Sequence, residues 1–180
     1  MPDKTRILLS DTNILDALLK ADLVGILDVL VKTLGVELCM IDRVFDELAA
    51  EWGEATAALP TVAVLRTVDN LFLEAEINAV CARRRALSET DAAQLCLAKA
   101  RGMTLWTNDG PLYDAAREDG LEAMRLFGPV IERVALGALP PSLAYRLLGS
   151  ERANNPWFSD TAAAAVEAVL KDAERRAVTH

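Results

Sequence analysis

The sequence predicts an α/β fold in which helices cover both faces of a mostly parallel sheet. Short apolar runs of strand length alternate with longer segments whose apolar residues recur at helical spacing. This alternation ends near Gly128, after which only helical spacing continues. Because alternating strands and helices form a parallel sheet between two helical layers, we expect a three-layer α/β/α arrangement followed by a C-terminal helical extension.

Apolar or β-branched runs are expected to form the strands. They lie at residues 6–10, 36–41, 61–68, 103–107 and 121–126. The first run is followed directly by the carboxylate of Asp11, and the fourth by Asn108 and Asp109. Runs of this length that are bounded by turn residues are typical of buried strands.

Between these strands, apolar residues recur every three or four positions, which predicts helices. The expected helices lie at residues 12–34, 42–52, 70–85, 88–100 and 111–118. The first of them is expected to break near Gly25 or at residues 21–22. Gly35, Gly102 and Gly120 follow helical segments, as residues that adopt a positive φ easily often do.

Further helices are expected after Gly128. They lie at residues 129–139, 142–148 and 159–177, with proline-containing breaks at residues 140–141 and 154–156. Proline removes a helical hydrogen bond, so both stretches separate helices. We therefore divide the chain into a first domain at residues 1–128 and a helical C-terminal extension at residues 129–180 that packs on it.

The composition argues against several classes of site. The net charge of −8 is not typical of a nucleic-acid-binding protein, but it suits a carboxylate metal site or a basic partner. The single His, at position 180, argues against a His-rich zinc site and a Ser-His-Asp triad. No apolar run approaches the roughly 20 residues of a membrane span, so we expect a cytoplasmic protein without membrane contact.

Acidic residues recur at comparable points of this pattern. Asp11 and Asp109 follow strands, whereas Glu47 and Asp91 lie early in helices. In a parallel sheet these places converge on one edge. Carboxylates in close company cannot all ionise without a cation, and oxygen ligands select Mg²⁺ or Mn²⁺.

Each of these residues also has an ordinary structural interpretation. Asp11 and Asp109 fit turn or capping positions, and Asp91 fits a capping box. Glu47 fits a solvated helix position, and the neighbouring Asp46 is a competing candidate for its place in the site. The joint placement of the four residues, rather than any one of them, favours a functional site.

The motifs around these carboxylates resemble those of the PIN-domain family of metal-dependent ribonucleases. They are Asp11-Thr12-Asn13, Val44-Phe45-Asp46-Glu47-Leu48, Ser88-Glu89-Thr90-Asp91-Ala92 and Thr107-Asn108-Asp109. The resemblance covers about residues 6–127. The resemblance implies a PIN-like fold for residues 1–128. In size, the chain is most similar to the VapC-type toxins of bacterial and archaeal toxin–antitoxin pairs.

The resemblance also implies a reaction and a set of site residues. Asp11, Asp91 and Asp109 would bind Mg²⁺ or Mn²⁺, and Glu47 would complete the shell or orient the attacking water. The residues expected to support the site are Thr12, Asn13 and Thr107. The implied activity is hydrolysis of RNA phosphodiester bonds that leaves a 5′-phosphate and a 3′-hydroxyl. The implied partners are an RNA substrate, an antitoxin protein and a second copy of the chain in a homodimer.

Two alternatives remain open at this point. The first is a PIN-like module that binds protein or RNA with weak or no catalysis. The second is a phosphatase with Asp11 as nucleophile, which is disfavoured because Asn13 occupies the position where that class usually has a second Asp. The segment after Gly128 is longer than a minimal PIN domain needs, and it is interpreted as a lid, a dimer element or a partner-docking surface.

Two further stretches call for an interpretation. The basic run at residues 83–85 is expected to be a solvated helix end, with a phosphate-steering patch as the alternative. Trp157 and Phe158 follow a proline between helices, and we expect them to anchor the C-terminal helix rather than a partner. Trp106 is expected in the core.

Overall fold

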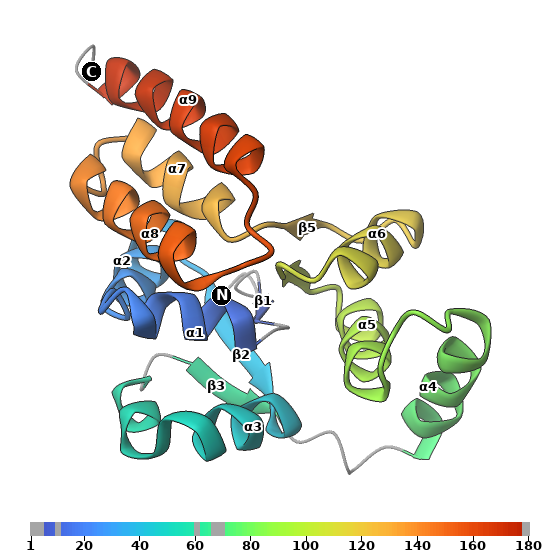
Figure 1. The fold of residues 1–180 in the computed structure, drawn as a ribbon. Coiled ribbons are helices and arrows are strands. Elements are labelled where there is room, and N and C mark those ends of the chain that lie inside the picture. Colours follow the sequence, from blue (N-terminus) through green and yellow to red (C-terminus); the bar gives the residue numbers. More distant parts are fainter. Residues whose placement is uncertain (1–5, 10–11, 60–61, 66–70, 178–180) are drawn as a thin grey trace.

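The computed structural model describes residues 6–9, 12–59, 62–65 and 71–177, and the fold is a mixed α/β arrangement (Figure 1). The strands are β1 (Arg6–Leu9), β2 (Glu37–Ile41), β3 (Val62–Leu65), β4 (Thr104–Trp106) and β5 (Ala123–Met124). The helices before β5 are α1 (Thr12–Lys20), α2 (Ile26–Leu34), α3 (Asp42–Trp52), the 3-10 helix η1 (Gly53–Ala58), α4 (Leu71–Arg83), α5 (Glu89–Arg101) and α6 (Gly110–Glu118). The helices after β5 are α7 (Phe127–Ala135), α8 (Pro141–Asn154) and α9 (Asp160–Ala177).

The described strands form one parallel sheet in the order β3-β2-β1-β4-β5. The chain builds the sheet outward from β1 in one direction through β2 and β3, and then in the other through β4 and β5. The order therefore reverses between β1 and β4, where Leu9 is in register with Trp106. In parallel sheets, sites form outside the carboxyl ends of the strands at such a reversal.

The core consists of two hydrophobic clusters that share the strands. Leu38 and Met40 of β2 lie in one cluster, and Cys39 and Ile41 lie in the other. Successive side chains of a strand point to opposite faces, so the clusters occupy opposite faces of the sheet. The first cluster draws on α1, α2 and α7–α9, and the second on α4, α5 and α6.

Of the helices after β5, α8 packs beside α1 and α7 beside α2, and α9 packs on α7 and α8 (Figure 1). The guanidinium of Arg146 on α8 donates to the carbonyl oxygen of Ala21, at 3.0 Å from Nε and 2.8 Å from an Nη atom. Ala21 lies in the turn after α1, so this contact fixes α8 against that helix. None of the described helices combines the length and apolar character that a membrane span requires.

Several predicted boundaries differ from the observed ones. The first helical segment breaks between Lys20 and Ile26, as predicted. The predicted strand at 121–126 is shorter, because Leu121 donates its backbone N–H to Ala116 at the end of α6, and Leu126 donates to the side chain of Asn108. The 3-10 helix η1 was not predicted. The described part of the strand predicted at 61–68 is Val62–Leu65.

Candidate active-site cleft

A cleft of about 640 Å³ opens beside the carboxyl end of β4. Three segments line it: α1 with Asn13 and Asp16, the β4–α6 connection with Asp109, and the end of α8 and the turn after it, with Glu151 and Trp157. Its volume lies within the range of roughly 300–1,000 Å³ that is typical of small-ligand sites. The cleft thus joins the strand edge at the reversal point to the C-terminal helices.

The connection after β4 is fixed by its own polar side chains. The buried Thr107 hydroxyl accepts a hydrogen bond from the backbone N–H of Asp109, at 3.0 Å. Asp109 Oδ1 then accepts from the N–H of Leu112, at 2.7 Å, and so caps α6. Asn108 Oδ1 accepts from the N–H of Leu126, at 3.0 Å. These bonds set where the Asp109 carboxylate lies at the mouth of the cleft.

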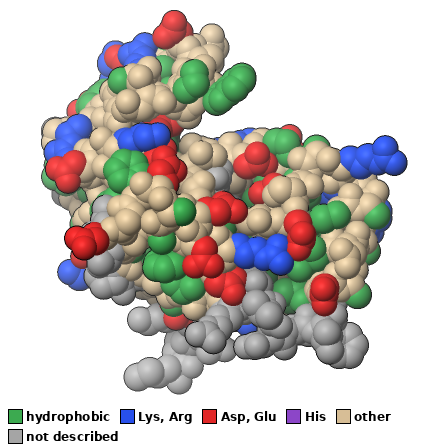
Figure 2. Space-filling view, turned by 60° about the horizontal axis from the view of Figure 1, so that its bottom comes forward, with side chains coloured by type: hydrophobic (Ala, Val, Ile, Leu, Met, Phe, Trp, Pro, Cys, Tyr) green, Lys and Arg blue, Asp and Glu red, His purple; other side chains and the backbone are tan. Residues whose placement is uncertain are grey.

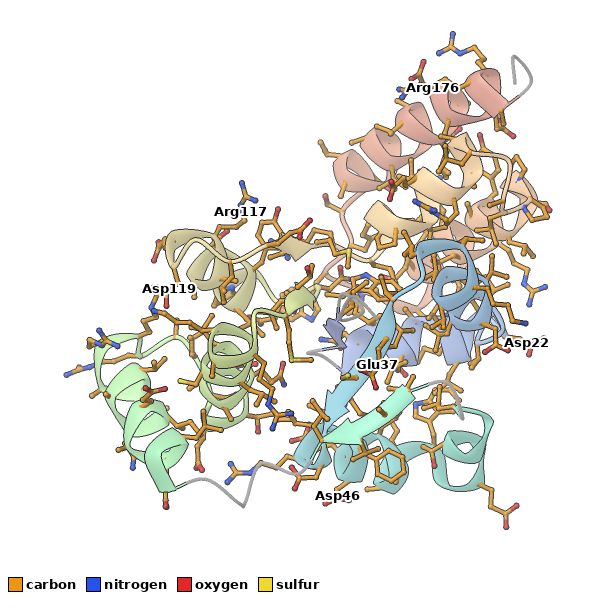
Figure 3. All side chains as sticks on the ribbon, turned by 180° about the vertical axis from the view of Figure 1, so that it is seen from behind. Asp22, Glu37, Asp46, Arg117, Asp119 and Arg176 are labelled. Atoms are coloured by element: carbon orange, nitrogen blue, oxygen red, sulfur yellow. The ribbon has the colours of Figure 1, made fainter. Side chains whose placement is uncertain are left out.

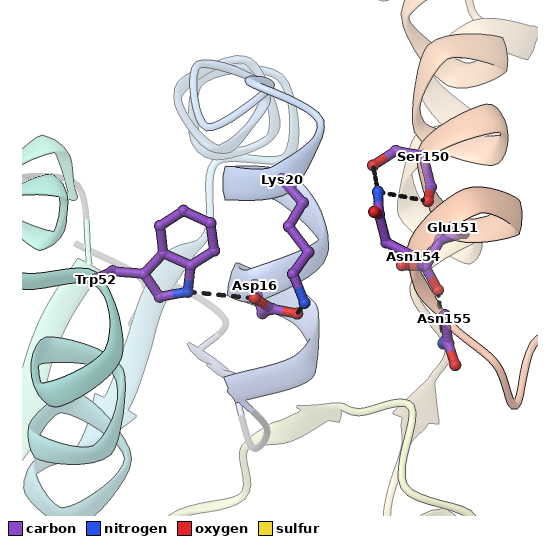
Figure 4. Close-up of polar contacts among 7 residues, drawn as sticks. All are labelled: Asp16, Lys20, Trp52, Ser150, Glu151, Asn154 and Asn155. Atoms are coloured by element: carbon purple, nitrogen blue, oxygen red, sulfur yellow. Dashed lines mark hydrogen bonds and ion pairs between the residues drawn. The ribbon is translucent and has the colours of Figure 1, made fainter.

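The wall formed by α1 carries a polar chain of contacts (Figure 4). Asp16 Oδ1 accepts from the indole N–H of Trp52 on α3, at 3.2 Å, and its Oδ2 lies 2.6 Å from Lys20 Nζ. The hydrogen bond to Asp16 raises the pKa of Lys20, against the opposing effect of desolvation. Asn13 is exposed and lies one turn before Asp16 on the cleft-facing side of α1.

The facing wall contains a buried carboxylate, Glu151 of α8. Its side chain is 5 % exposed, and Oε2 accepts from the amide of Asn155 at 3.0 Å. Burial raises the pKa of Glu151, and the Asn155 hydrogen bond opposes that shift. The charge of Asp16 raises the pKa further, and that of Lys20 lowers it. The lining of the cleft thus includes the carboxylates of Asp16, Asp109 and Glu151 and one ammonium group, that of Lys20.

The structure brings together only part of the predicted site. Asn13 and Asp109 line the cleft, with Thr107 directly behind Asp109. Thr12 is the first residue of α1. Asp11 lies outside the described residues.

Glu47 and Asp91 are not among the described residues that line the cleft. Glu47 is exposed on α3. Asp91 forms the capping box of α5: its N–H donates to Ser88 Oγ at 3.1 Å, and its Oδ2 accepts from the Ser88 N–H at 2.9 Å. Asp91 thus has the capping role that its structural interpretation predicted. This role uses one of its two carboxylate oxygens.

Metal-ligating side chains do not form a complete group in the part of the chain that the structure describes. No set of three or more His, Cys, Asp or Glu side chains among these residues is arranged to hold a metal ion. The carboxylates of the cleft are hard oxygen donors of the kind that Mg²⁺ and Mn²⁺ prefer. In the chemical nature of its donors, the cleft therefore fits such an ion.

The basic run at residues 83–85 is largely used in local structure. Arg84, directly after α4, pairs with Asp119 at 2.5 Å and with Glu118 at 3.0 Å, which ties the end of α4 to the end of α6. Figure 3 labels Asp119, which lies between α4 and α6. Arg83 donates from Nε to the carbonyl oxygen of Ala79 in its own helix, at 3.2 Å. Arg83 is exposed at the helix end, as predicted, whereas Arg84 is half-buried in an ion pair with another helix rather than solvated.

Trp157 and Phe158 have different roles. The Phe158 ring stacks on Phe127 with 5.8 Å between ring centroids, which anchors the turn before α9 as predicted. The Trp157 side chain is 92 % exposed, so the anchoring prediction is wrong for this residue. Sequence reasoning also missed Asp16 and Glu151, because charged residues on amphipathic helices carry no local signal that distinguishes them from solvated ones.

Comparison of the chain with protein-family models and with curated protein sequences gives no match.

Proposed function

We propose that this protein is a divalent-metal-dependent endoribonuclease with a three-layer, PIN-like nuclease domain, and the toxin of a toxin–antitoxin pair. The observation that carries the proposal is that Asn13 and Asp109 line one cleft at the point where the strand order reverses. The carboxylates of Asp16, Asp109 and Glu151 line that cleft, and its volume lies within the range of small-ligand sites.

The register of the sheet supports a shared site for the two strand-end carboxylates. Leu9 of β1 pairs with Trp106 of β4. In sequence, Asp11 follows Leu9 by two residues and Asp109 follows Trp106 by three. In sequence, both carboxylates thus follow the ends of neighbouring parallel strands within three residues.

A contact between α3 and α5 connects the two helices that carry the remaining candidate carboxylates. Arg43 of α3 pairs with Glu89 of α5 at 2.7 Å, which brings the first turns of the two helices together. Glu47 lies one turn beyond Arg43 on the same side of α3. Asp91 lies in the same first turn of α5 as Glu89 but on another side of that helix, since residues two apart do not face the same way.

The residues that would bind Mg²⁺ or Mn²⁺ are Asp11, Asp91 and Asp109, with Glu47 completing the shell. The bound ion would supply activated water and stabilise the negative charge that develops during phosphodiester hydrolysis. The protein's contribution is to position these ligands: Thr107 fixes the backbone of Asp109, and the caps of α5 and α6 each use one carboxylate oxygen. The second oxygen of each carboxylate has no capping role.

The charge of the chain favours a basic inhibitor. Asp and Glu side chains spread across one face of the molecule (Figure 2), and the net charge is −8. A basic segment of an antitoxin would be attracted to such a surface. We include an antitoxin and a second copy of this chain as proposed partners, and a cytoplasmic location as the setting in which they meet.

A catalytically weak PIN-like binding module is the second candidate. It is favoured by the capping role of Asp91 and by the lack of a metal-ligand group among the described residues. Calorimetric titration with Mn²⁺ separates the two candidates. A nuclease should bind the ion in the wild-type chain and lose that binding in Asp11→Asn, whereas equal heats in both proteins would favour the binding module.

A further inference from the structure

The exposed indole of Trp157 stands at the rim of the candidate cleft. It lies in the turn between α8 and α9 and is one of the residues that line the cleft with Asp109 and Asn13. Its side chain is 92 % exposed, whereas Trp106 is fully buried and Trp52 is half-buried. Leaving an indole in water forgoes hydrophobic stabilisation, so its exposure beside a site requires an explanation.

The turn that carries Trp157 is held on both sides. Asn155 Oδ1 accepts from the Trp157 N–H at 3.0 Å, and Asn155 itself is tied to Glu151 by its amide. On the other side, Phe158 stacks on Phe127. The exposed ring is thus presented from a fixed backbone and does not sit on a loose loop.

The lining of the cleft indicates the kind of occupant. Apart from Trp157, most of its side chains are carboxylates or the amides of Asn108, Asn154 and Asn155. An amphipathic protein helix would need a continuous apolar wall, which this lining does not offer. An unpaired nucleobase needs one aromatic face for stacking and polar groups at its edge.

Stacking also suits the charge of the site. Asp16, Asp109 and Glu151 repel phosphate groups, and Lys20 is already paired with Asp16. Base–aromatic stacking does not depend on a positive surface, so it can hold a strand where electrostatic attraction is weak. A single aromatic ring at the rim would therefore contribute a large share of the affinity for RNA.

We propose that Trp157 is a base-stacking residue that binds an unpaired RNA base next to the candidate cleavage site. This subsite rests on the proposed ribonuclease function and assigns part of its substrate binding to the C-terminal helices. It requires the substrate to be single-stranded at this point, because a paired base cannot present its face to the indole.

Binding of RNA to the full chain tests the subsite. Asp109→Asn serves as the background, so that RNA stays intact in the presence of Mg²⁺. A short oligoadenylate should quench the indole emission of this protein, and a duplex RNA of the same length should not. Trp157→Phe should keep most of the affinity and lose the quenching, which assigns the signal to Trp157 rather than to Trp52 or Trp106.

Removal of the ring gives the decisive comparison. Trp157→Ala should weaken oligoadenylate binding by roughly 5- to 150-fold, which corresponds to the loss of one base–aromatic stack. Leu136→Ala is the matched control, because Leu136 is also an exposed apolar side chain, at 61 %, and does not line the cleft. It should leave the affinity unchanged.

The outcomes separate the subsite from the proposed function. Equal affinity of Trp157→Ala and the background protein for oligoadenylate would overturn the subsite, even if the wild-type chain cleaves RNA. Quenching that is lost in Trp157→Phe, in a chain whose wild type does not cleave RNA, would support the subsite and contradict the nuclease. Unchanged emission with both RNAs would also overturn it and would favour a protein segment as the occupant.

Discussion

The guanidinium of Arg43 on α3 lies 2.7 Å from the carboxylate of Glu89 on α5. The pair joins the first turns of the two helices that carry Glu47 and Asp91. The hydrogen bond to Glu89 raises the pKa of Arg43, although an arginine is charged over the whole working range of pH in any case. A polar contact between residues far apart in the chain therefore links the two helices that carry these candidate ligands.

Reversing this pair should affect cleavage more than stability. Both side chains are about half exposed, so Arg43→Glu should lower the free energy of unfolding by about 1 kcal/mol or less. Its repulsion of Glu89 should separate α3 from α5 and reduce metal-dependent cleavage. The double variant Arg43→Glu with Glu89→Arg should recover the rate. Urea unfolding and RNA cleavage rates measure both effects, and a double variant no faster than the single one would contradict the positioning role.

Asp109 is expected to have two separable roles. Asp109→Asn keeps an N-cap oxygen for α6, so its stability should change by about 0.5 kcal/mol or less, while cleavage falls by about 100-fold or more. Asp109→Ala should lose the same activity and a further ~1 kcal/mol of stability, because the Leu112 N–H loses its acceptor. Thermal unfolding and cleavage of both variants test this. An active Asp109→Asn would remove Asp109 from the metal site.

Ser88 is expected to have only a structural role. Ser88→Ala removes the hydroxyl that accepts from the Asp91 N–H and donates to Asp91 Oδ2 at 2.6 Å, so α5 should lose about 1 kcal/mol. Cleavage should persist at temperatures well below unfolding, since the Asp91 carboxylate remains. Asp91→Asn, which keeps a side-chain oxygen, should show the opposite pattern of retained stability and lost cleavage. An Asp91→Asn protein as active as an active Ser88→Ala protein would show that helix capping alone explains the role of Asp91.

Glu151 should make stability depend on pH. Burial raises its pKa above the ordinary value of 4.5, so the folded state favours the protonated carboxyl. The unfolding free energy should therefore fall as pH rises from about 4.5 through the higher pKa of the folded state. Glu151→Gln can still accept the Asn155 hydrogen bond and carries no charge, so it should be more stable than wild type at neutral pH. The two proteins should converge at acidic pH.

Urea unfolding at a series of pH values measures this difference. The matched control is Glu167→Gln on α9, whose carboxylate pairs with Lys171 at the surface. The Lys171 hydrogen bond lowers the pKa of Glu167, so this substitution should give no gain at neutral pH. A Glu151→Gln protein less stable than wild type at neutral pH would show that the charged carboxylate is favoured in the folded state.

The order of elements could be predicted because each strand is a short apolar run followed by an amphipathic segment. The residues at which the strands begin and end could not be predicted. Leu121 and Leu126 are apolar, as strand residues often are. The Leu121 N–H nevertheless donates to the carbonyl oxygen of Ala116, and the Leu126 N–H donates to the side chain of Asn108. The Leu121 bond is local and closes the end of α6, with Gly120 at positive φ, whereas the Leu126 bond depends on a side chain 18 residues away and leaves no signal in the local sequence.

The strand-end half of the cleft could be predicted, and the helical half could not. Asn13 and Asp109 follow strands, so the edge that they share follows from the alternation of strands and helices. Glu151 and Trp157 reach the cleft because α8 packs beside α1, where apolar residues of α8 join the core and Arg146 donates to the carbonyl oxygen of Ala21. That contact spans 125 residues of the chain, and no spacing pattern predicts it.

Cleavage of RNA by the wild-type chain is the measurement that tests the central claim most directly. The assay compares a single-stranded RNA with Mn²⁺, with Mg²⁺ and with excess chelator, and includes Asp11→Asn under the same conditions. We predict internal cuts that leave 5′-phosphates with either ion, no cuts with chelator, and a loss of about 100-fold or more in Asp11→Asn. Cleavage that survives the chelator, or an Asp11→Asn protein that cuts at the wild-type rate, would contradict a carboxylate-bound metal at this site.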